Sequence, residues 1–118
     1  MPKETPALVD EFANCVVAQQ QAIARGDATT GNDLARRYVA AFKALRLRGD
    51  SGRDALAVLL SDSRSEVRVM AAAYLLRHCG ASARSVLEVE AQGKGLTAFG
   101  AQEALKRWNE GSWSLDPA

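Results

Sequence analysis

Apolar residues recur three and four positions apart along most of this 118-residue sequence, and glycines stand between the apolar runs. This spacing places apolar side chains on one face of an α-helix, so each run predicts an amphipathic helix. A glycine just beyond a run supplies the left-handed backbone that commonly ends a helix. The long runs cover residues 8–23, 34–45, 67–75 and 98–108, and the glycines that follow them are Gly26, Gly49, Gly80 and Gly111.

Two shorter apolar segments raise the number of predicted helices to six. One contains Leu56, Leu59 and Leu60, and the other contains Val86 and Leu87. Short turns between helices favour antiparallel hairpins, and no segment alternates with the period of a strand. We therefore expect an all-α fold, a right-handed stack of three antiparallel helical hairpins, as one domain over residues 1–118. Residues 109–118 are predicted to cap the C-terminal end of the stack.

Two segments have residues typical of helix starts. Thr5 precedes Pro6, which combines a capping hydroxyl with a proline suited to the first helical turn. Ser63 and Glu66 have the spacing of a capping box, in which each side chain accepts a hydrogen bond from the other residue's backbone N–H. The sequence therefore predicts that helices begin at these two segments.

The segment 59–73 combines a predicted turn with the start of the next helix. Leu59 and Leu60 precede Asp62 in the turn, and Arg68 follows in the helix. This order resembles a repeat of the HEAT family. In HEAT repeats the aspartate of the turn meets the arginine of the second helix, and such pairs stack into a ladder. The equivalent places of the other two predicted hairpins hold neither aspartate nor arginine. The resemblance therefore implies a structural turn pair in the middle hairpin and no continuous ladder.

A second resemblance covers most of the chain. The residues that support it are Leu8, Phe12, Gln20, Asn32, Gly52, Arg53, Leu56, Leu59, Leu60, Asp62, Val67, Arg68, Ala71, Ala72, Ala83, Leu87 and Trp108. Their order resembles that of a short bacterial HEAT-like family named domain of unknown function twenty-nineteen. The resemblance implies a HEAT-like α-solenoid. Small bacterial helical-repeat proteins often neutralise toxins or act as adaptors, so it also implies an immunity or adaptor role.

Few residues have the pattern of a catalytic or metal-binding site. His78 is the single histidine, and it lies in a helical run without an acid–base partner at a suitable spacing. Cys15 and Cys79 also lie in apolar helical runs and lack the spacing of metal ligands. We therefore expect two reduced core cysteines, no catalytic residue, no metal, no cofactor and a protein that is not an enzyme.

The sequence also predicts where the protein resides. No segment contains the roughly 20 consecutive apolar residues that a membrane-spanning helix requires. The first residues form no apolar signal core. We therefore expect a cytoplasmic protein without a membrane partner, in which the rarity of cytosolic disulfides agrees with reduced cysteines.

Positive charge is concentrated in the middle of the sequence. Residues 36–84 contain ten basic and four acidic side chains, although the whole chain has a formal net charge of only +1. Arginine binds carboxylates and phosphates with paired hydrogen bonds. The basic residues that lie off the apolar faces of their predicted helices are candidates for a partner-binding groove. They are Arg36, Arg37, Lys43, Arg64, Arg68 and Arg77.

Three hypotheses account for this basic segment. The arginines can be solvated or paired within the protein, and Arg68 in particular can serve the turn at Asp62. They can bind a partner protein with an acidic surface, because complementary charge speeds association and selects partners. They can also bind nucleic acid, although the small net charge and the scarcity of aromatic residues among the arginines disfavour it. We expect a non-enzymatic protein-binding scaffold, with nucleic-acid binding by a basic concave face as the alternative.

Trp113 is a further candidate for partner binding. It follows Gly111 in a segment that has no helical apolar pattern. One hypothesis is that its ring packs back on the last hairpin as part of the capping tail. The other is that the ring is exposed and anchors a partner, since tryptophan is enriched among the residues that dominate binding energy in interfaces.

Overall fold

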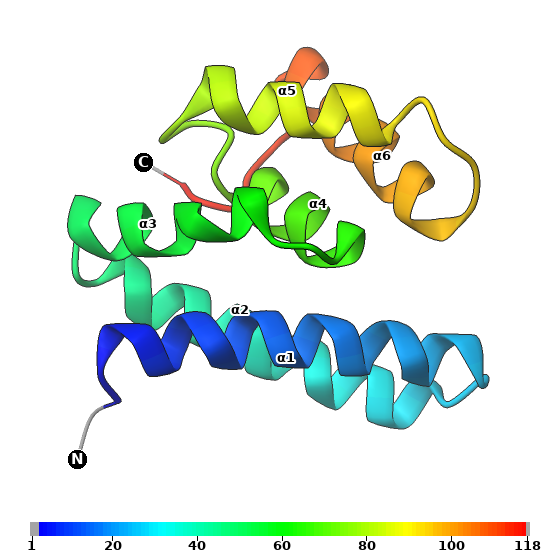
Figure 1. The fold of residues 1–118 in the computed structure, drawn as a ribbon, viewed down its shortest axis with the longest axis horizontal. Helices are drawn as coiled ribbons and strands as arrows, with labels where there is room; N and C mark the ends of the chain where they lie inside the picture. Colours follow the sequence, from blue (N-terminus) through cyan, green and yellow to red (C-terminus); the bar gives the residue numbers. More distant parts are fainter. Residues whose placement is uncertain (1–2, 118) are drawn as a thin grey trace. The chain divides into compact units, whose positions relative to one another are not determined.

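The computed structural model describes residues 3–117, and within that range the chain forms helices and turns without a strand. The helices are α1 (Thr5–Ala24), α2 (Ala28–Arg46), α3 (Asp50–Ala57), the 3₁₀ helix η1 (Val58–Ser61), α4 (Ser65–Tyr74), α5 (Gly80–Glu90) and α6 (Leu96–Glu110) (Figure 1). The prediction of an all-α fold is confirmed. The packing divides the chain into two compact units, Met1–Leu56 and Ala57–Ala118, and the single-domain prediction stays a prediction.

The first unit is built on a long helical hairpin. Figure 1 shows α1 and α2 side by side and running in opposite directions. Their buried residues include Phe12 and Phe42, and the rings of Phe12 and Tyr38 meet edge to face with centroids 5.7 Å apart. Ile23 ends the first predicted apolar face but is 44% exposed, because it lies in the last turn of α1 before the connection to α2.

Local signals explain most of the ends of these two helices. Pro6 stands in the first turn of α1 as predicted, but Glu4 occupies the capping position and makes no side-chain capping bond. The capping prediction for Thr5 is therefore wrong, because the Thr5 hydroxyl instead accepts a hydrogen bond from Arg48 at 2.6 Å. Asp27 caps α2 by accepting a hydrogen bond from the backbone N–H of Thr30 at 3.1 Å.

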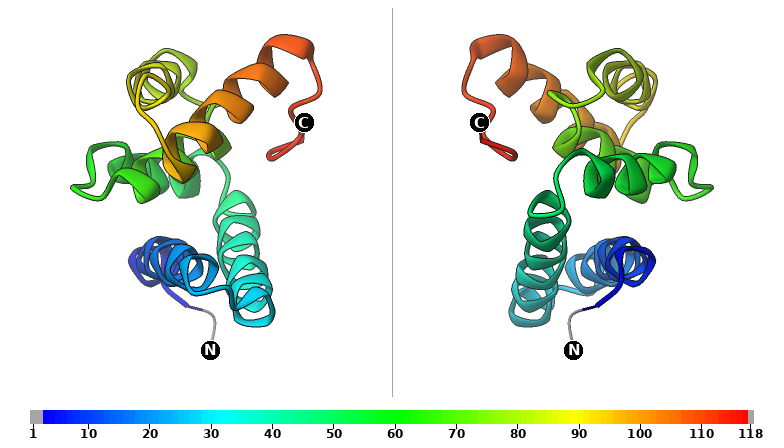
Figure 2. Two further views of the ribbon diagram at one scale, coloured as in Figure 1. Left: turned by 90° about the vertical axis from the view of Figure 1, so that its right-hand side faces the viewer. Right: turned by 90° about the vertical axis from the view of Figure 1, so that its left-hand side faces the viewer.

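The second unit contains η1, α4, α5 and α6, and α4 packs against the other three. Its core combines leucines and valines with many alanines, which allow helix axes to approach closely. Fully buried members include Val67, Ala71, Ala72, Leu75, Ala83, Leu87 and Ala101. After α6 the chain turns back at Gly111, whose left-handed backbone ends the helix, and residues 112–117 return to α4 without forming a helix (Figure 2).

Glycine marks three of the four predicted helix ends. Gly26, Gly49 and Gly111 have positive φ values of 75°, 69° and 76°. The prediction for Gly80 is wrong, because α4 already ends at Tyr74 and Gly80 begins α5. The turn between them begins at Leu75, whose backbone has left the helical conformation with φ −102° and ψ 9°, and both Leu75 and Leu76 are buried in this turn. Among the described helices, none is both long and apolar enough to cross a membrane.

Candidate functional site

The six basic residues predicted to bind a partner are divided between the two units. Arg36, Arg37 and Lys43 lie on α2 in the first unit, and their side chains are exposed. The other three belong to the second unit: Arg64 and Arg68 lie at the start of α4, and Arg77 lies in the turn before α5. Each unit therefore has its own set of basic residues, and the partners of each set decide how much charge is available for binding.

On α2, the two arginines have acidic partners within the first unit. Arg36 lies 2.6 Å from the carboxylate of Asp33, one turn earlier on the same helix. Arg37 lies 3.6 Å from Glu11 on α1, and Glu11 is also 2.5 Å from the amine of Lys3. The hydrogen bond from Lys3, together with the charges of Lys3 and Arg37, lowers the pKa of Glu11 although partial burial opposes this shift. Lys43 is exposed on the same helix.

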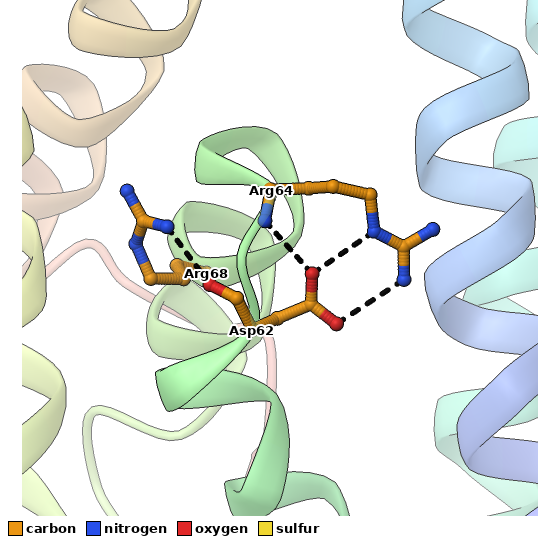
Figure 3. A network of polar contacts seen from close by, with 3 residues as sticks. All are labelled: Asp62, Arg64 and Arg68. Carbon is orange, nitrogen blue, oxygen red and sulfur yellow. Dashed lines mark hydrogen bonds and ion pairs between the residues drawn. The ribbon is translucent and has the colours of Figure 1, made fainter.

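Asp62 organises the turn between η1 and α4 (Figure 3). Its carboxylate accepts hydrogen bonds from the backbone N–H of Arg64 at 2.9 Å and from the Arg64 guanidinium at 2.9 and 3.1 Å. These bonds lower the pKa of Asp62, with smaller contributions from the charges of Arg64 and Arg68, and they raise the pKa of Arg64. The guanidinium of Arg64 is therefore bound within its own turn.

Arg68, which the HEAT resemblance pairs with Asp62, bonds the backbone of that residue. The guanidinium of Arg68 donates to the backbone carbonyl of Asp62 at 2.8 Å, while the carboxylate of Asp62 is held by Arg64. Arg68 also donates to Glu90 at 2.5 Å, which joins the start of α4 to the last turn of α5. Arg68 thus connects a turn and two helices, which is a structural role.

The predicted capping box at the start of α4 is not formed. Arg64 occupies the capping position, and no side chain there bonds the first turn. The carboxylate of Asp62 instead accepts from the N–H of Arg64, two residues later, as aspartate commonly does in turns. The carboxylate of Asp62, just before Ser63, therefore makes the side-chain hydrogen bond at this turn that the sequence predicted for Ser63 and Glu66.

Arg77 and Trp113 hold the C-terminal tail, residues 112–117, against α4. The indole N–H of Trp113 donates to the backbone carbonyl of Ala73 at 2.8 Å, and its ring meets Trp108 edge to face with centroids 5.2 Å apart. The guanidinium of Arg77 lies 3.3 Å from Asp116. Of the two hypotheses for Trp113, the half-buried ring agrees with packing back on its own unit.

A cavity of about 280 Å³ lies beside this tail. It opens to solvent, and small residues of α4 and α6 form part of its wall together with the indole of Trp113. The lining residues are Ala73, Gly100, Glu103, Ala104, Arg107, Ser112, Trp113, Ser114 and Leu115. The cavity is therefore mostly apolar and has charged groups at only two positions.

Sequence reasoning missed a set of exposed apolar residues at the joined ends of α5 and α6. Val89 is 66% exposed, Leu96 is 51% exposed and Phe99 is 56% exposed. We call these three residues the apolar corner. The exposure of Phe99 could have been predicted from the sequence. Successive residues of a helix point about 100° apart, and Ala98 belongs to the buried face. Leu96 and Phe99 are neighbours one turn apart on α6, and exposed large apolar side chains that lie side by side are typical of interaction sites.

Catalytic chemistry has few candidates in the described residues. His78 and Cys79 are half-buried in the turn before α5, whereas Cys15 is buried in α1 as predicted for a core residue. Within residues 3–117, no group of three or more histidine, cysteine or acidic side chains has the arrangement of a metal site.

The fold and these contacts define an all-helical protein with two compact units and an exposed apolar corner on the second. No family model matches the sequence, and no curated protein or solved structure matches the chain.

Proposed function

We propose that this chain is a non-enzymatic protein-binding module and that the apolar corner of the second unit is its main contact surface. The observation that supports this proposal is the exposure of Phe99 together with Leu96, one turn apart on α6. Aromatic anchors surrounded by apolar neighbours contribute most of the binding energy in many protein interfaces. Lys94 lies in the turn between the two helices and adds a positive charge at the edge of this surface.

The ion pairs of the basic residues favour apolar contact as the main contribution to binding, whereas the sequence predicted charge complementarity. Arg36, Arg37 and Arg64 each have a carboxylate partner within their own unit, which reduces the charge that they offer to an acidic partner. Arg68 and Arg77 are engaged in the same way. We therefore propose a partner protein that buries the apolar corner, with charge complementarity as a secondary contribution. Nucleic acid is the less favoured alternative for the same reason.

The finer features of the predicted fold belong to this proposal. We propose that the helices form a HEAT-like right-handed stack of hairpins, as in the bacterial family that the sequence resembles. The α1–α2 hairpin and the packing of α4 with α5 and α6 support it. Within that framework, an immunity or adaptor role in the cytoplasm is the biological setting that we propose.

Affinity capture with matched variants tests the proposal. The full chain is immobilised as wild type, as Phe99→Ser and as Leu47→Ser, and proteins captured from the native cell lysate are quantified. Leu47 is a suitable control because it is 86% exposed but lies in the first unit. We expect a stoichiometric partner that is reduced at least about tenfold by Phe99→Ser and retained by Leu47→Ser, since an aromatic hot spot contributes about 2 kcal/mol or more.

Two outcomes would contradict the proposal. Equal capture of the same proteins by the wild type and the Phe99→Ser variant would exclude the apolar corner as the contact surface. Loss of the partner only in a variant with Arg36→Glu and Arg37→Glu would assign binding to the basic residues of α2 instead. Circular dichroism of each variant establishes that the helices are retained.

A further inference from the structure

The C-terminal tail satisfies groups on α4 and in the turn that follows it. Ala73 lies in the last turn of α4, where backbone carbonyls have no donor within the helix. The indole N–H of Trp113 supplies that donor at 2.8 Å. A segment of the chain 40 residues away thus completes the end of a helix.

Three residues beyond Trp113, Asp116 provides a second anchor. Asp116 is the one charged residue that is fully buried among residues 3–117. Its carboxylate lies 3.3 Å from the guanidinium of Arg77, which also donates to the carbonyl of Pro117 at 3.2 Å. A buried carboxylate is stable only when it is paired, so this contact gives the position a strong requirement for an acidic side chain.

The tail does not fill the surface on which it lies. Between its two anchors, Ser114 and Leu115 are exposed, and Leu115 retains 40% of its accessible surface. The cavity of about 280 Å³ beside Trp113 remains open, with Ala73, Gly100 and Ala104 in its wall. A segment with a larger apolar side chain in place of Ser114 has room to bury more apolar surface there, which stabilises binding.

We propose that this surface of α4 and α6 is a recognition site for an extended peptide of a partner protein. The peptide has an aromatic residue, a large apolar residue and, three residues after the aromatic one, a carboxylate that pairs with Arg77. The chain's own tail occupies the site in cis and lowers the apparent affinity for the partner. This site goes beyond the apolar corner, and its test does not depend on Phe99.

The geometry sets a competition between the two segments. A tethered segment has an effective concentration in the millimolar range, so a free peptide must overcome the occupancy of the site by the tail. The apparent affinity falls in proportion to the fraction of molecules in which the site is open. Weakening the anchors of the tail therefore increases the affinity for a peptide added in trans.

Fluorescence anisotropy of labelled peptides tests this proposal on the full chain. The probes are a peptide of residues 111–117 and two variants of it, Ser114→Leu and Asp116→Asn. The receptors are the wild type, the full chain with Trp113→Ala and Asp116→Asn, and that double variant with Arg77→Gln added. The single variant Asp116→Asn, which keeps Trp113, replaces the double variant if circular dichroism shows a loss of helix.

We expect the peptide of residues 111–117 to bind the double variant at least about tenfold more tightly than the wild type, because the open fraction increases by that factor. The Ser114→Leu peptide binds more tightly still. Either the Asp116→Asn change in the peptide or Arg77→Gln in the receptor weakens binding about tenfold, because each removes one partner of a charge-assisted pair.

Equal affinity for the wild type and the double variant would overturn the proposal, as would a folded double variant that binds none of the peptides. Light scattering after size-exclusion chromatography tests the other possible occupant, which is the tail of a second copy of the chain. A dimer of the wild type that dissociates on Asp116→Asn would show that a second copy's tail fills the site, which would overturn the assignment to a partner protein.

Discussion

At the scale of single residues, the carboxylate of Asp62 determines the entry to α4. It accepts three hydrogen bonds from Arg64, one of them from the backbone. We expect Asp62→Ala to lower the free energy of unfolding by about 1 kcal/mol at pH 7, the usual cost of removing a hydrogen-bonded acceptor from a turn. Asp62→Asn is expected to cost less, since its amide oxygen still accepts from the N–H of Arg64. Urea denaturation measures both changes.

The lowered pKa of Asp62 gives this contribution a definite pH dependence. Because the pKa in the folded state lies below the usual value of 3.8, the carboxylate contributes its full stabilisation above that pH and loses it as the pH falls through the folded-state pKa. The difference between the wild type and Asp62→Ala should therefore shrink below about pH 3.8. Asp10→Ala, at an exposed position of α1, is the control. A difference that stays constant in acid would contradict this role.

Gly52 is another residue whose identity has a local physical reason. A Cβ atom at this position in α3 would lie 2.0 Å from the backbone carbonyl oxygen of Leu45. We expect Gly52→Ala to lower the free energy of unfolding by about 1–3 kcal/mol, because the close approach of two backbone segments cannot be relieved by a side-chain rotation. Gly80→Ala is the matched control, since no atom lies within 4 Å of its Cβ position. It should leave stability unchanged or increase it by up to about 1 kcal/mol. Thermal or urea denaturation compares the two, and equal effects would contradict the steric argument.

At the scale of helices, the Arg68–Glu90 pair links α4 to α5. The two side chains are 26% and 20% exposed, whereas those of Arg36 and Asp33 are 75% and 66% exposed. Water screens the less exposed pair less effectively. Double-mutant cycles should therefore give a coupling energy of about 1 kcal/mol for Arg68 with Glu90 and about 0.3 kcal/mol for Arg36 with Asp33. A coupling near zero for Arg68 with Glu90 would show that this pair does not link α5 to α4.

The positions of the helices were more predictable than their exact ends, because the apolar spacing extends along a whole helix whereas an end depends on a few residues. Within residues 3–117 the apolar spacing located five of the predicted helices, whereas the one predicted to contain Leu56, Leu59 and Leu60 is divided between α3 and the 3₁₀ helix η1. The left-handed conformation at Gly26, Gly49 and Gly111 follows from the sequence around each glycine. Gly80 failed as a predictor, because α4 already ends at Tyr74 and the buried residues Leu75 and Leu76 lie in the turn before Gly80. The apolar spacing continues through this turn and therefore does not show where the helix stops.

The candidate site was much less predictable, because its contacts join distant parts of the sequence. Arg68 meets Glu90 across 22 residues, and Trp113 meets Ala73 across 40 residues. No spacing rule connects such positions before the helices have packed. The pairs of Arg36 with Asp33 and of Arg64 with Asp62 are local and could have been predicted from their spacing. The partners of Arg37, Arg68 and Arg77 lie far away in the sequence and are known only from the structure.

At the scale of the whole molecule, the charge available to a polyanion is small. The formal net charge is +1, and the internal ion pairs of Arg36, Arg37 and Arg64 neutralise part of the basic segment. The affinity for DNA increases with the number of phosphates that the protein neutralises. The dependence of that affinity on salt concentration becomes steeper in the same way. Nucleic-acid binding, the alternative function, therefore requires more available positive charge than this chain offers.

We expect the wild type to bind a labelled DNA duplex with a Kd weaker than about 0.1 mM at physiological salt, with a shallow salt dependence. Anisotropy titrations at several salt concentrations measure both. The double variant Glu11→Gln and Asp33→Asn removes the carboxylates beside Arg37 and Arg36, so it should bind more tightly at low salt and with a steeper slope. Micromolar binding by the wild type, with a slope equivalent to several phosphates and sensitivity to Arg64→Gln, would instead favour a nucleic-acid-binding protein. In that case the internal ion pairs would have to open on binding, and their disruption by Glu11→Gln and Asp33→Asn would increase the affinity further.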